Sequence, residues 1–464
     1  MLMVSKNNIE SGSFRDPSGF IFTQNKHIFR QINKQYKEDY EFLMTSGLYK
    51  RLVDKQLLVP HQEKKGIKLQ SKSGYKIIEP QLIPFISYPY EWSFSQLKDA
   101  ALLTLEVQQE ALEYDMVLKD ASAFNIQFYK GRPILIDTLS FSKYEPGKPW
   151  IAYRQFCQHF LSPLALMSYT DVRLNKLSQI HVDGIPLDLA STLLPKITWK
   201  NIGILFHIHL HAASQNKFLQ IKGERKVNEA KVSKASLTEL CNNIKNTVNK
   251  LIWKPDKTTW AGYYDDTNYQ DSSFIFKKQF TSEVTKKLKP KLIWDLGANT
   301  GIFSKQCLDS RDSFIVSSDI DPGAVEINYL DCKKSNYQNI LPLIIDLTNP
   351  SPNLGWNNKE RKSFLDRGPA DMILALALIH HLAISNNVPL ESISEFFAEQ
   401  GKYLIIEFIP KEDSQVKKLL STRDDIFPDY SVSGFLDVFL RRYSLLQREP
   451  IPGSERELFV FKKK

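Results

Sequence analysis

The sequence predicts an α/β protein with two parts: an α+β module followed by an open, mostly parallel sheet covered by helices. Two patterns predict this fold class. From about residue 276 onward, strand-like apolar runs alternate with helical stretches, which is typical of a parallel sheet. Before that point, short strand-like runs come first and helical stretches follow them. A chain of 464 residues, 42% apolar, is long enough for two or three such cores.

The N-terminal part begins with a predicted hairpin. "GFIFTQNKHIFRQI" alternates apolar and polar residues on both sides of an Asn25-Lys26 turn. Residues 36–57 have helical spacing, and the prolines of "KIIEPQLIPFISYPYEW" favour an extended segment after them. "SFSQLKDAALLTLEVQQEALEY" then repeats apolar residues three and four apart, as a long helix does. We expect a small lobe over residues 14–92 and a helical lobe over 93–195.

Residues 196–257 are helical in pattern and lysine-rich towards their end, so we interpret them as a helical connector. Within it, "HIHLH" places His207 and His211 on one helical face. No third ligand with a recognisable spacing is near, which favours a core or interface helix over a metal site. Residues 258–464 are expected to form a separate domain.

A glycine turn marks the start of that domain's sheet. "KLIWDLGANTG" is an apolar strand-like run, then a turn, then helical spacing. Gly297 permits backbone angles that other residues avoid, and Gly301 would let the start of the helix lie close to a ligand.

Acids recur at the ends of the following strand-like runs. "SFIVSSDID" ends at Asp319, 24 residues after Asp295, and later runs end at Asp346 and Glu407. Ligands of open α/β sheets bind at the carboxyl ends of the strands, and an acid at the tip of the second strand is placed to hold ribose hydroxyls. The spacing therefore predicts a nucleoside site.

The pattern resembles the class I S-adenosylmethionine-dependent methyltransferases over residues 258–464. Their signature is an acid, then G-x-x-x-G or G-x-G-x-G, then an acid that ends strand two. Asn299 stands here where many members have the central glycine. "YSLLQREPIPGSERELFVFKK" predicts a final hairpin, like the antiparallel last strands of that seven-stranded fold.

The resemblance implies S-adenosylmethionine as cofactor. The methionine part would lie among Asp295, Gly297, Asn299 and Gly301. Asp319 would hold the ribose, Ile320 would pack on the adenine, and Asp346 with Leu347 would face the adenine amino group. Upstream, "WAGYYDDTNYQ" is interpreted either as an aromatic lid or as ordinary packing on the sheet, with Trp260 and Tyr264 as candidate cofactor contacts.

Methyl transfer to oxygen needs an aligned nucleophile and a base. His380 and His381 follow the fourth strand, and histidine titrates near neutral pH, so either is a candidate base. The alternative is that one of them only caps the strand. Glu407 and Asp413 are weaker candidates. No N-P-P-Y string occurs, so methylation of the amino group of a base or of glutamine is not indicated.

A second motif lies in "LKDASAFNIQFYKGRPILIDTLSF". Asp120 precedes Asn125 by five residues, and Asp137 follows Asn125 by twelve, after a hairpin that turns at Lys130-Gly131. The order resembles the catalytic and metal loops of protein kinases and their small-molecule relatives. The resemblance implies a magnesium–ATP site, with Asp120 as base and Asn125 and Asp137 as metal ligands.

The motif departs from the kinase pattern in three places. No His-Arg precedes Asp120, Thr-Leu follows Asp137 instead of Phe-Gly, and no glycine-rich loop occurs near the start. Arg30, paired with Glu38 or Glu41, is our candidate for the missing phosphate-binding lysine. The alternative is a plain hairpin in which acids and amides serve as turn residues.

The net charge is +9, but the lysine clusters carry no interleaved aromatics, so a solvated surface is favoured over a nucleic-acid site. No run of about 18 apolar residues occurs, which predicts no membrane span. The start shows no secretory signal and the four cysteines show no C-x-x-C spacing, so we expect a cytoplasmic protein.

We predict a methyltransferase that acts on a small molecule or glycan, with the N-terminal module recruiting the acceptor or binding a nucleotide. Two alternatives remain open. One is a bifunctional kinase–methyltransferase acting on a saccharide or glycan end, and the other is an RNA methyltransferase. The arrangement also resembles bacterial nodulation-type methyltransferases.

Overall fold

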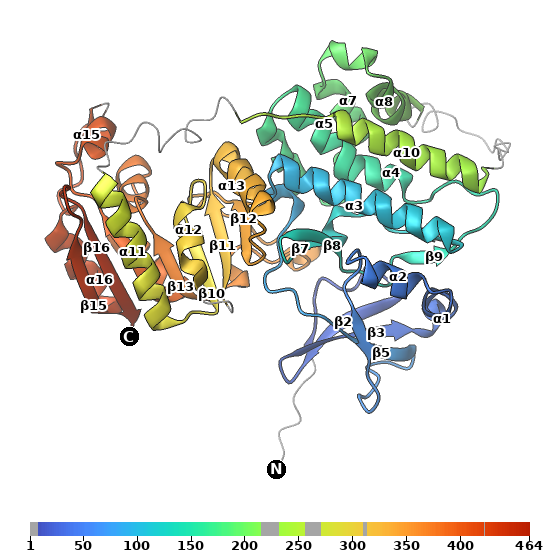
Figure 1. Cartoon of the computed structure of the whole chain (residues 1–464), viewed down its shortest axis with the longest axis horizontal. Helices are drawn as coiled ribbons and strands as arrows, with labels where there is room; N and C mark the ends of the chain where they lie inside the picture. Colours follow the sequence, from blue (N-terminus) through green and yellow to red (C-terminus); the bar gives the residue numbers. More distant parts are fainter. Residues whose placement is uncertain (1–7, 215–231, 256–270, 310–312, 422) are drawn as a thin grey trace. The chain divides into compact units, whose positions relative to one another are not determined.

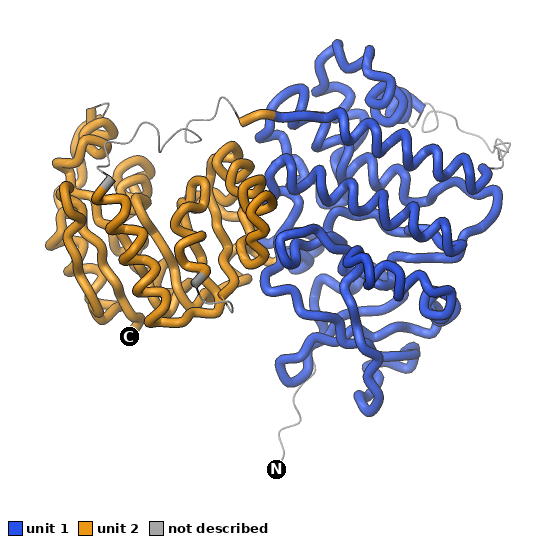
Figure 2. Tube along the Cα trace, in the orientation of Figure 1, with its two compact units in different colours: residues 1–253, 353–361 blue, residues 254–352, 362–464 orange. Residues whose placement is uncertain are grey.

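The computed structural model describes residues 8–214, 232–255, 271–309, 313–421 and 423–464, which form two compact units (Figures 1 and 2). Unit 1 comprises residues 1–253 together with 353–361. Unit 2 comprises residues 254–352 and 362–464. No described helix has the length and apolar character needed to cross a membrane. The four cysteines all lie in described segments, where they are buried and free of disulfides.

The small lobe of unit 1 is built on an antiparallel sheet. Among the described residues its strand order is β1-β2-β3-β5-β4. The strands are β1 (Asn8–Ile9), β2 (Gly19–Gln24), β3 (His27–Asn33), β4 (His61–Glu63) and β5 (Gly74–Pro80). Asn25 and Lys26 both have positive φ, 50° and 68°, which is the turn that matches the twist of a two-residue hairpin. The predicted hairpin is confirmed.

Two helices, rather than one, follow that hairpin. α1 (Lys37–Thr45) and α2 (Leu48–Asp54) are separated at Gly47, whose φ of 92° is left-handed. A left-handed residue cannot continue a right-handed helix, so the single helix expected over residues 36–57 is broken there.

The rest of unit 1 is mainly helical and is organised around the long helix α3 (Phe94–Glu113), which begins with a capping box at Ser93 and Gln96. The smaller helices around it are α4 (Tyr153–Phe156), α5 (Ser162–Tyr169), α6 (Leu177–Ile180), α7 (Leu187–Leu193), α8 (Ile202–Ile204) and α10 (Lys234–Lys250). Two short ribbons complete it: β6 (Met116–Leu118) with β9 (Phe141–Lys143), and β7 (Ile126–Tyr129) with β8 (Arg132–Leu135).

The segment expected as a connector, residues 196–257, is instead part of unit 1 up to Trp253. α10 packs along α3: Gln109 Nε2 donates to Asn242 Oδ1 at 2.7 Å, and Lys98 Nζ donates to the carbonyl of Leu251 at 2.8 Å. The apolar face of α10 is buried there, which its lysine-rich composition did not reveal.

Residues 353–361 also belong to unit 1, although they interrupt the sequence of unit 2. Glu360 accepts two hydrogen bonds from Arg15, at 2.7 and 2.9 Å. Ser11 Oγ donates to the carbonyl of Lys359 at 2.7 Å, and the Arg361 guanidinium lies 4.4 Å from the centre of the Phe124 ring. This segment is thus held by charge-assisted and cation–π contacts.

Unit 2 is built on a sheet with strand order β12-β11-β10-β13-β14-β16-β15 in its described residues. The strands are β10 (Leu292–Leu296), β11 (Phe314–Asp319), β12 (Ile340–Ile344), β13 (Ala370–Ala375), β14 (Gly401–Phe408), β15 (Tyr443–Pro450) and β16 (Glu457–Lys463). The first five are parallel, and β16 runs antiparallel to both β14 and β15. The predicted parallel sheet with a final hairpin is confirmed.

Helices pack on both faces of this sheet (Figure 1). They are α11 (Asp271–Leu288), α12 (Ile302–Gln306), α13 (Pro322–Lys334), α14 (Leu390–Gln400), α15 (Ser414–Leu420) and α16 (Val432–Arg442). Side chains alternate between the faces of a strand. On one face, Ile293 and Ile315 join a core cluster with Phe280 of α11. On the other, Phe435 of α16 packs against Phe459 and Phe461.

We expect Phe435→Ala to destabilise unit 2 by about 3–5 kcal/mol, because the fully buried ring leaves a cavity among aromatic neighbours. Urea denaturation followed by circular dichroism measures this. Leu446→Ala, at an exposed position of β15, is the matched control and should change stability by less than about 0.5 kcal/mol. Equal effects of the two substitutions would contradict this packing.

Candidate functional site

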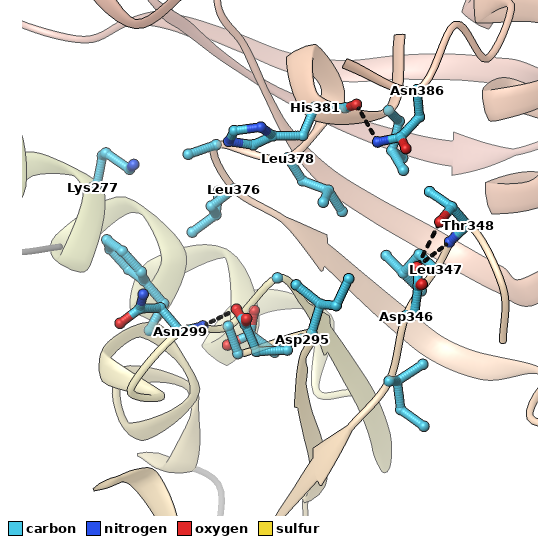
Figure 3. A pocket seen from close by; sticks show the side chains of 18 of the residues that line it. Lys277, Asp295, Asn299, Asp346, Leu347, Thr348, Leu376, Leu378, His381 and Asn386 are labelled. Carbon is cyan, nitrogen blue, oxygen red and sulfur yellow. Dashed lines mark hydrogen bonds between the residues drawn. The ribbon is translucent and has the colours of Figure 1, made fainter. Parts of the chain in front are cut away.

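A cavity of about 240 Å³ opens at the carboxyl ends of the parallel strands of unit 2 (Figure 3). Its walls come from α11 and from the segments that follow β10, β11, β12 and β13. The lining residues are Phe274, Lys277, Asp295, Gly297, Ala298, Asn299, Phe303, Asp319, Ile320, Ile345, Asp346, Leu347, Thr348, Leu376, Ala377, Leu378, His381, Leu382 and Asn386.

The glycine turn shapes one wall of this cavity. Gly297 and Asn299 have φ of 74° and 51°, and the amides of Gly297 and Ala298 both donate to the carbonyl of Ser318 at 2.9 Å. The loop is therefore fixed to the end of β11. Gly301, with φ of 72°, does not line the cavity: a Cβ there would lie 2.3 Å from Asn328 Oδ1. Its smallness allows close packing against α13, and its expected approach to a ligand stays a prediction.

The carboxylate of Asp319 is held in place by backbone amides. Oδ2 accepts from the amide of Asn299 at 2.8 Å, and Oδ1 accepts from the amide of Asp321 at 2.9 Å. Burial raises the pKa of Asp319 to about 6, although both hydrogen bonds favour the ionised form. The side chain is thus oriented at the cavity wall as an acceptor for hydroxyl groups.

Asp295 lies deeper beside the same cavity. Its Oδ2 accepts from the Ser304 hydroxyl at 2.6 Å. Burial raises the pKa of Asp295 to about 7; the Ser304 hydrogen bond lowers it, and the nearby Asp319 carboxylate raises it further. Two carboxyl groups whose pKa values are both raised by burial therefore border the cavity.

The predicted adenine contacts line the same cavity. Ile320, Asp346 and Leu347 all contribute to its wall, and Ile320 keeps 55% of its surface exposed. Asp346 Oδ1 accepts from the amide and the hydroxyl of Thr348, so part of its carboxylate shapes its own turn. Trp260 and Tyr264, the predicted lid contacts, lie outside the described residues.

The two candidate bases differ in position. His381 lines the cavity, and its carbonyl accepts from Asn386 Nδ2 at 2.8 Å (Figure 3). His380 is buried and does not line it. Burial lowers the pKa of both imidazoles, and for His380 the nearby His381 and Arg456 lower it further. Both rings are therefore neutral near pH 7, but only His381 borders the space where an acceptor would bind.

A buried ion network that the sequence did not predict adjoins the cavity. Lys277 Nζ lies 2.6 Å from Glu407 Oε2, with side chains that are 2% and 0% exposed. Arg456 lies 3.4 Å from Glu407 and 2.7 Å from Asp413, so two cations face two anions. Glu407 Oε2 also accepts from the amide of Ala377, whose φ of 50° is strained for alanine.

Lys277 enters the cavity at the opposite end from Asp346 (Figure 3). Burial lowers the pKa of its ammonium group, and the Glu407 carboxylate opposes that shift. In the sequence Lys277 is followed by Lys278 in "FIFKKQF". Only its position in the helical repeat, three residues after Phe274, could have distinguished Lys277 from Lys278. Glu407 and Asp413 act here as partners of these cations.

In unit 1, the structure brings Asp120, Asn125 and Asp137 together. Asp120 Oδ1 accepts from the amide of Ser122 at 2.9 Å and from Gln155 Nε2 at 2.8 Å, and its carboxylate also hydrogen-bonds to the Asn125 side chain. Burial raises the pKa of Asp120, and the nearby Asp137 carboxylate raises it further. The predicted hairpin between them is confirmed as β7 and β8.

Arg30 lies at this cluster, but not with the expected partners. Its Nη1 is 2.5 Å from Asp137 Oδ1, and Nη2 is 3.4 Å from Asp16 Oδ2. Glu38 and Glu41 pair instead with Lys143 and Lys76. Arg30 therefore pairs directly with Asp137, one of the two residues predicted as metal ligands. Across the described segments, no three His, Cys, Asp or Glu side chains cluster as a metal site.

Comparison with known proteins gives one full-length relative. The chain is 34% identical to the nodulation protein NoeA of Rhizobium meliloti (strain 1021) over 458 residues, which is 98% of this chain and 96% of that protein. No protein-family model matches the sequence.

Similar solved structures cover less than half of the chain. The N-methyltransferase NodS from Bradyrhizobium japonicum WM9 is 10% identical, covers 42% of this chain and 99% of its own, and has a TM-score of 0.30. Magnesium protoporphyrin IX methyltransferase from Synechocystis PCC 6803 was solved with bound S-adenosylmethionine. It is 16% identical, covers 44% of this chain and 89% of its own, and has a TM-score of 0.28. WbdD is 14% identical, covers 47% of this chain and 46% of its own, and also has a TM-score of 0.28. The description of the fold therefore rests on the strand order and direction of the described sheet itself.

We expect Lys277→Met to destabilise the protein by about 3–5 kcal/mol, because it leaves the Glu407 carboxylate buried with only part of its compensating charge. The double variant Lys277→Met/Glu407→Gln should lose less than the single variant, since both charges are removed together. Urea denaturation of the full double-mutant cycle measures the coupling.

The neighbouring residue provides the control. Lys278 is only partly buried and lies over the Phe274 ring, so Lys278→Met should change stability by less than about 1 kcal/mol. Additive effects of the Lys277 and Glu407 substitutions would show that the pair contributes no coupling.

Proposed function

We propose that this chain, which belongs to the family of the nodulation protein NoeA, transfers a methyl group from S-adenosylmethionine to a nucleophilic acceptor. The observation that carries the proposal is the cavity of unit 2. It brings the Gly297 loop, Asp319 and Asp346 to one edge of a sheet with the methyltransferase strand order. Ligands of open α/β sheets bind at this edge.

The residues present fit this cofactor. The Asp319 carboxylate is oriented by two amides and is suited to accept from two ribose hydroxyls. The partly exposed Ile320 offers an apolar surface for a base, and Asp346 lies near it to accept from an exocyclic amine. The Gly297 loop and Asp295 would surround the methionine part, with the Lys277 ammonium group at the far end of the cavity (Figure 3).

When bound, the cofactor supplies an electrophilic methyl group, and this chain's residues align the acceptor and receive its proton. His381 is neutral near pH 7 because burial lowers its pKa, so it suits the role of base towards a hydroxyl acceptor. The apolar residues Leu376, Leu378 and Leu382 line the space beside it and limit access of water. We propose a small molecule or glycan as acceptor.

We expect affinity for S-adenosylhomocysteine to fall as the pH drops below about 6. The pKa of Asp319 is raised to about 6, so the carboxylate that holds the ribose is present above that pH and is lost by protonation below it. Between about pH 6 and pH 5 the affinity should fall about fivefold, in proportion to the ionised fraction of Asp319. Isothermal titration calorimetry across pH 5 to 8 measures it.

Asp319→Asn should weaken the binding of S-adenosylhomocysteine strongly and abolish the change in affinity near pH 6. Any change in affinity near pH 7 would come from the titration of Asp295. Two controls accompany it. Asp437→Asn, exposed on α16, should bind as the parent protein does, and His381→Asn should keep the affinity within about threefold because its proposed role is proton transfer. Unchanged binding by Asp319→Asn would overturn the cofactor assignment.

A second function has one specific observation in its favour, namely the convergence of Asp120, Asn125 and Asp137 with Arg30 in unit 1. We propose that this site binds a nucleoside triphosphate, with Arg30 turning from Asp137 to the phosphates. Asp120 would then face a hydroxyl acceptor, as in a kinase that acts on a saccharide or glycan end. If unit 1 has no phosphotransferase activity, its proposed role is to recruit the acceptor of the methyl group.

We expect measurable binding of ATP in the presence of Mn²⁺, and its loss in Asp137→Ala, because that change removes a proposed metal ligand and the partner of Arg30. Thermal shift and calorimetry are the measurements, and Asp183→Ala, a highly exposed carboxylate of unit 1, is the matched control. If the parent protein shows no ATP binding at millimolar nucleotide, the kinase proposal fails and the methyltransferase proposal is unaffected.

A further inference from the structure

Unit 1 carries a surface strip of large apolar side chains that we term the apolar ridge. Six such residues between positions 193 and 210 are each 38% to 67% exposed: Leu193, Ile197, Trp199, Ile202, Phe206 and Leu210. Single exposed apolar residues are ordinary, but a cluster of this kind marks an interaction surface.

The helix that carries half of the ridge has apolar side chains on both of its faces. It runs from α8 through the π-helical segment η7 (Leu205–Leu210), so residues four apart share a face. Ile202, Phe206 and Leu210 lie outward, whereas His207 and His209 are 4% and 1% exposed. Ile204 and Ile208 are fully buried beside the two histidines, so the outward face is apolar and the interior face mixes imidazoles with apolar groups.

The buried histidines of this helix are hydrogen-bonded inside unit 1. His207 hydrogen-bonds to Tyr153 Oη at 2.7 Å and to Asn243 Oδ1 at 2.8 Å. His209 hydrogen-bonds to Ser191 Oγ at 2.7 Å and to Thr198 Oγ1 at 2.9 Å. Both ring nitrogens of each of these two histidines have partners, so the polar groups of the interior face are satisfied inside unit 1. The outward apolar side chains remain on the surface.

Lysines outnumber acids around the ridge. No Asp or Glu occurs between Leu189 and Ser214, and the exposed Lys196 and Lys200 lie among the ridge residues, whereas the exposed Asp188 lies on α7 just before them. α10 packs beside this helix, where Gly203 approaches the Thr247 side chain. α10 adds Lys234, Lys245 and Lys250 and one acid, Glu239. The face thus combines apolar side chains, one of them tryptophan, with a rim of mainly positive charge.

We infer that the apolar ridge docks unit 1 on a lipid bilayer with anionic headgroups. An apolar face rimmed by lysines is the pattern of elements that lie in the membrane interface, and tryptophan is enriched at that depth. Negative headgroups attract such lysines, whereas a protein partner would have to supply its own acidic face. Docking involves no residue of either candidate catalytic site, so it stands independently of the proposed function.

The test is vesicle flotation with the full-length protein. We expect it to float with vesicles of phosphatidylcholine and phosphatidylglycerol at low salt, to float much less at high salt, and to stay largely unbound with phosphatidylcholine alone. Ile202→Ser/Phe206→Ser, which removes apolar surface, and Lys196→Glu/Lys200→Glu, which reverses the charge, should each lower the bound fraction about tenfold.

The controls separate docking from misfolding and from self-association. Leu82→Ser, at a 61% exposed position in the small lobe, should float as the parent protein does, and circular dichroism should be unchanged in all variants. Failure of the parent protein to bind anionic vesicles, or full binding by Ile202→Ser/Phe206→Ser, would overturn the inference. So would a concentration-dependent dimer, seen by light scattering, that the same double variant dissolves, since the ridge would then bind a second copy.

Discussion

The carboxylate of Asp319 links the loop after β10 to the tip of β11, and the candidate cofactor site depends on this link. One oxygen accepts from the amide of Asn299 and the other from the amide of Asp321, so the loop and the strand end hold a single orientation. Burial of the same carboxylate carries a desolvation penalty for its ionised form, which raises its pKa. In the function that we propose, a ribose with two hydroxyl groups would relieve part of that penalty.

The sequence predicted those parts of the structure that follow from local pattern. β10, β11, β12 and β14 are apolar runs that end near an acid or a glycine, so β10, β11 and β12 and the acids near their ends could be placed in advance. The hairpin at Asn25-Lys26 was also foreseen, because positive φ at both turn positions favours such residues. The family resemblance added the expectation of an antiparallel final hairpin, which β15 and β16 form.

What the sequence did not predict depends on contacts between distant residues. Lys277 is chemically identical to Lys278, and only the pairing with Glu407, 130 positions later, makes it a buried ion. Arg30 meets Asp137 across 107 positions and not the nearby glutamates. Gly301 was assigned to ligand approach, but its neighbour is Asn328 on the next helix. In each case the tertiary neighbour, and not the local motif, determines what the side chain does.

The segment 353–361 has a consequence for how this protein can be divided. Because these residues belong to unit 1 while both flanking stretches belong to unit 2, the polypeptide crosses between the units three times. Neither unit is a continuous stretch of sequence. Cleavage after Trp253 would separate Arg15, in the first fragment, from the Glu360 carboxylate that it binds. The second fragment would keep residues 353–361 without the unit to which they belong. The segments of the two units therefore alternate along the sequence. A recombination event at a single point could not exchange one whole unit without interrupting the other.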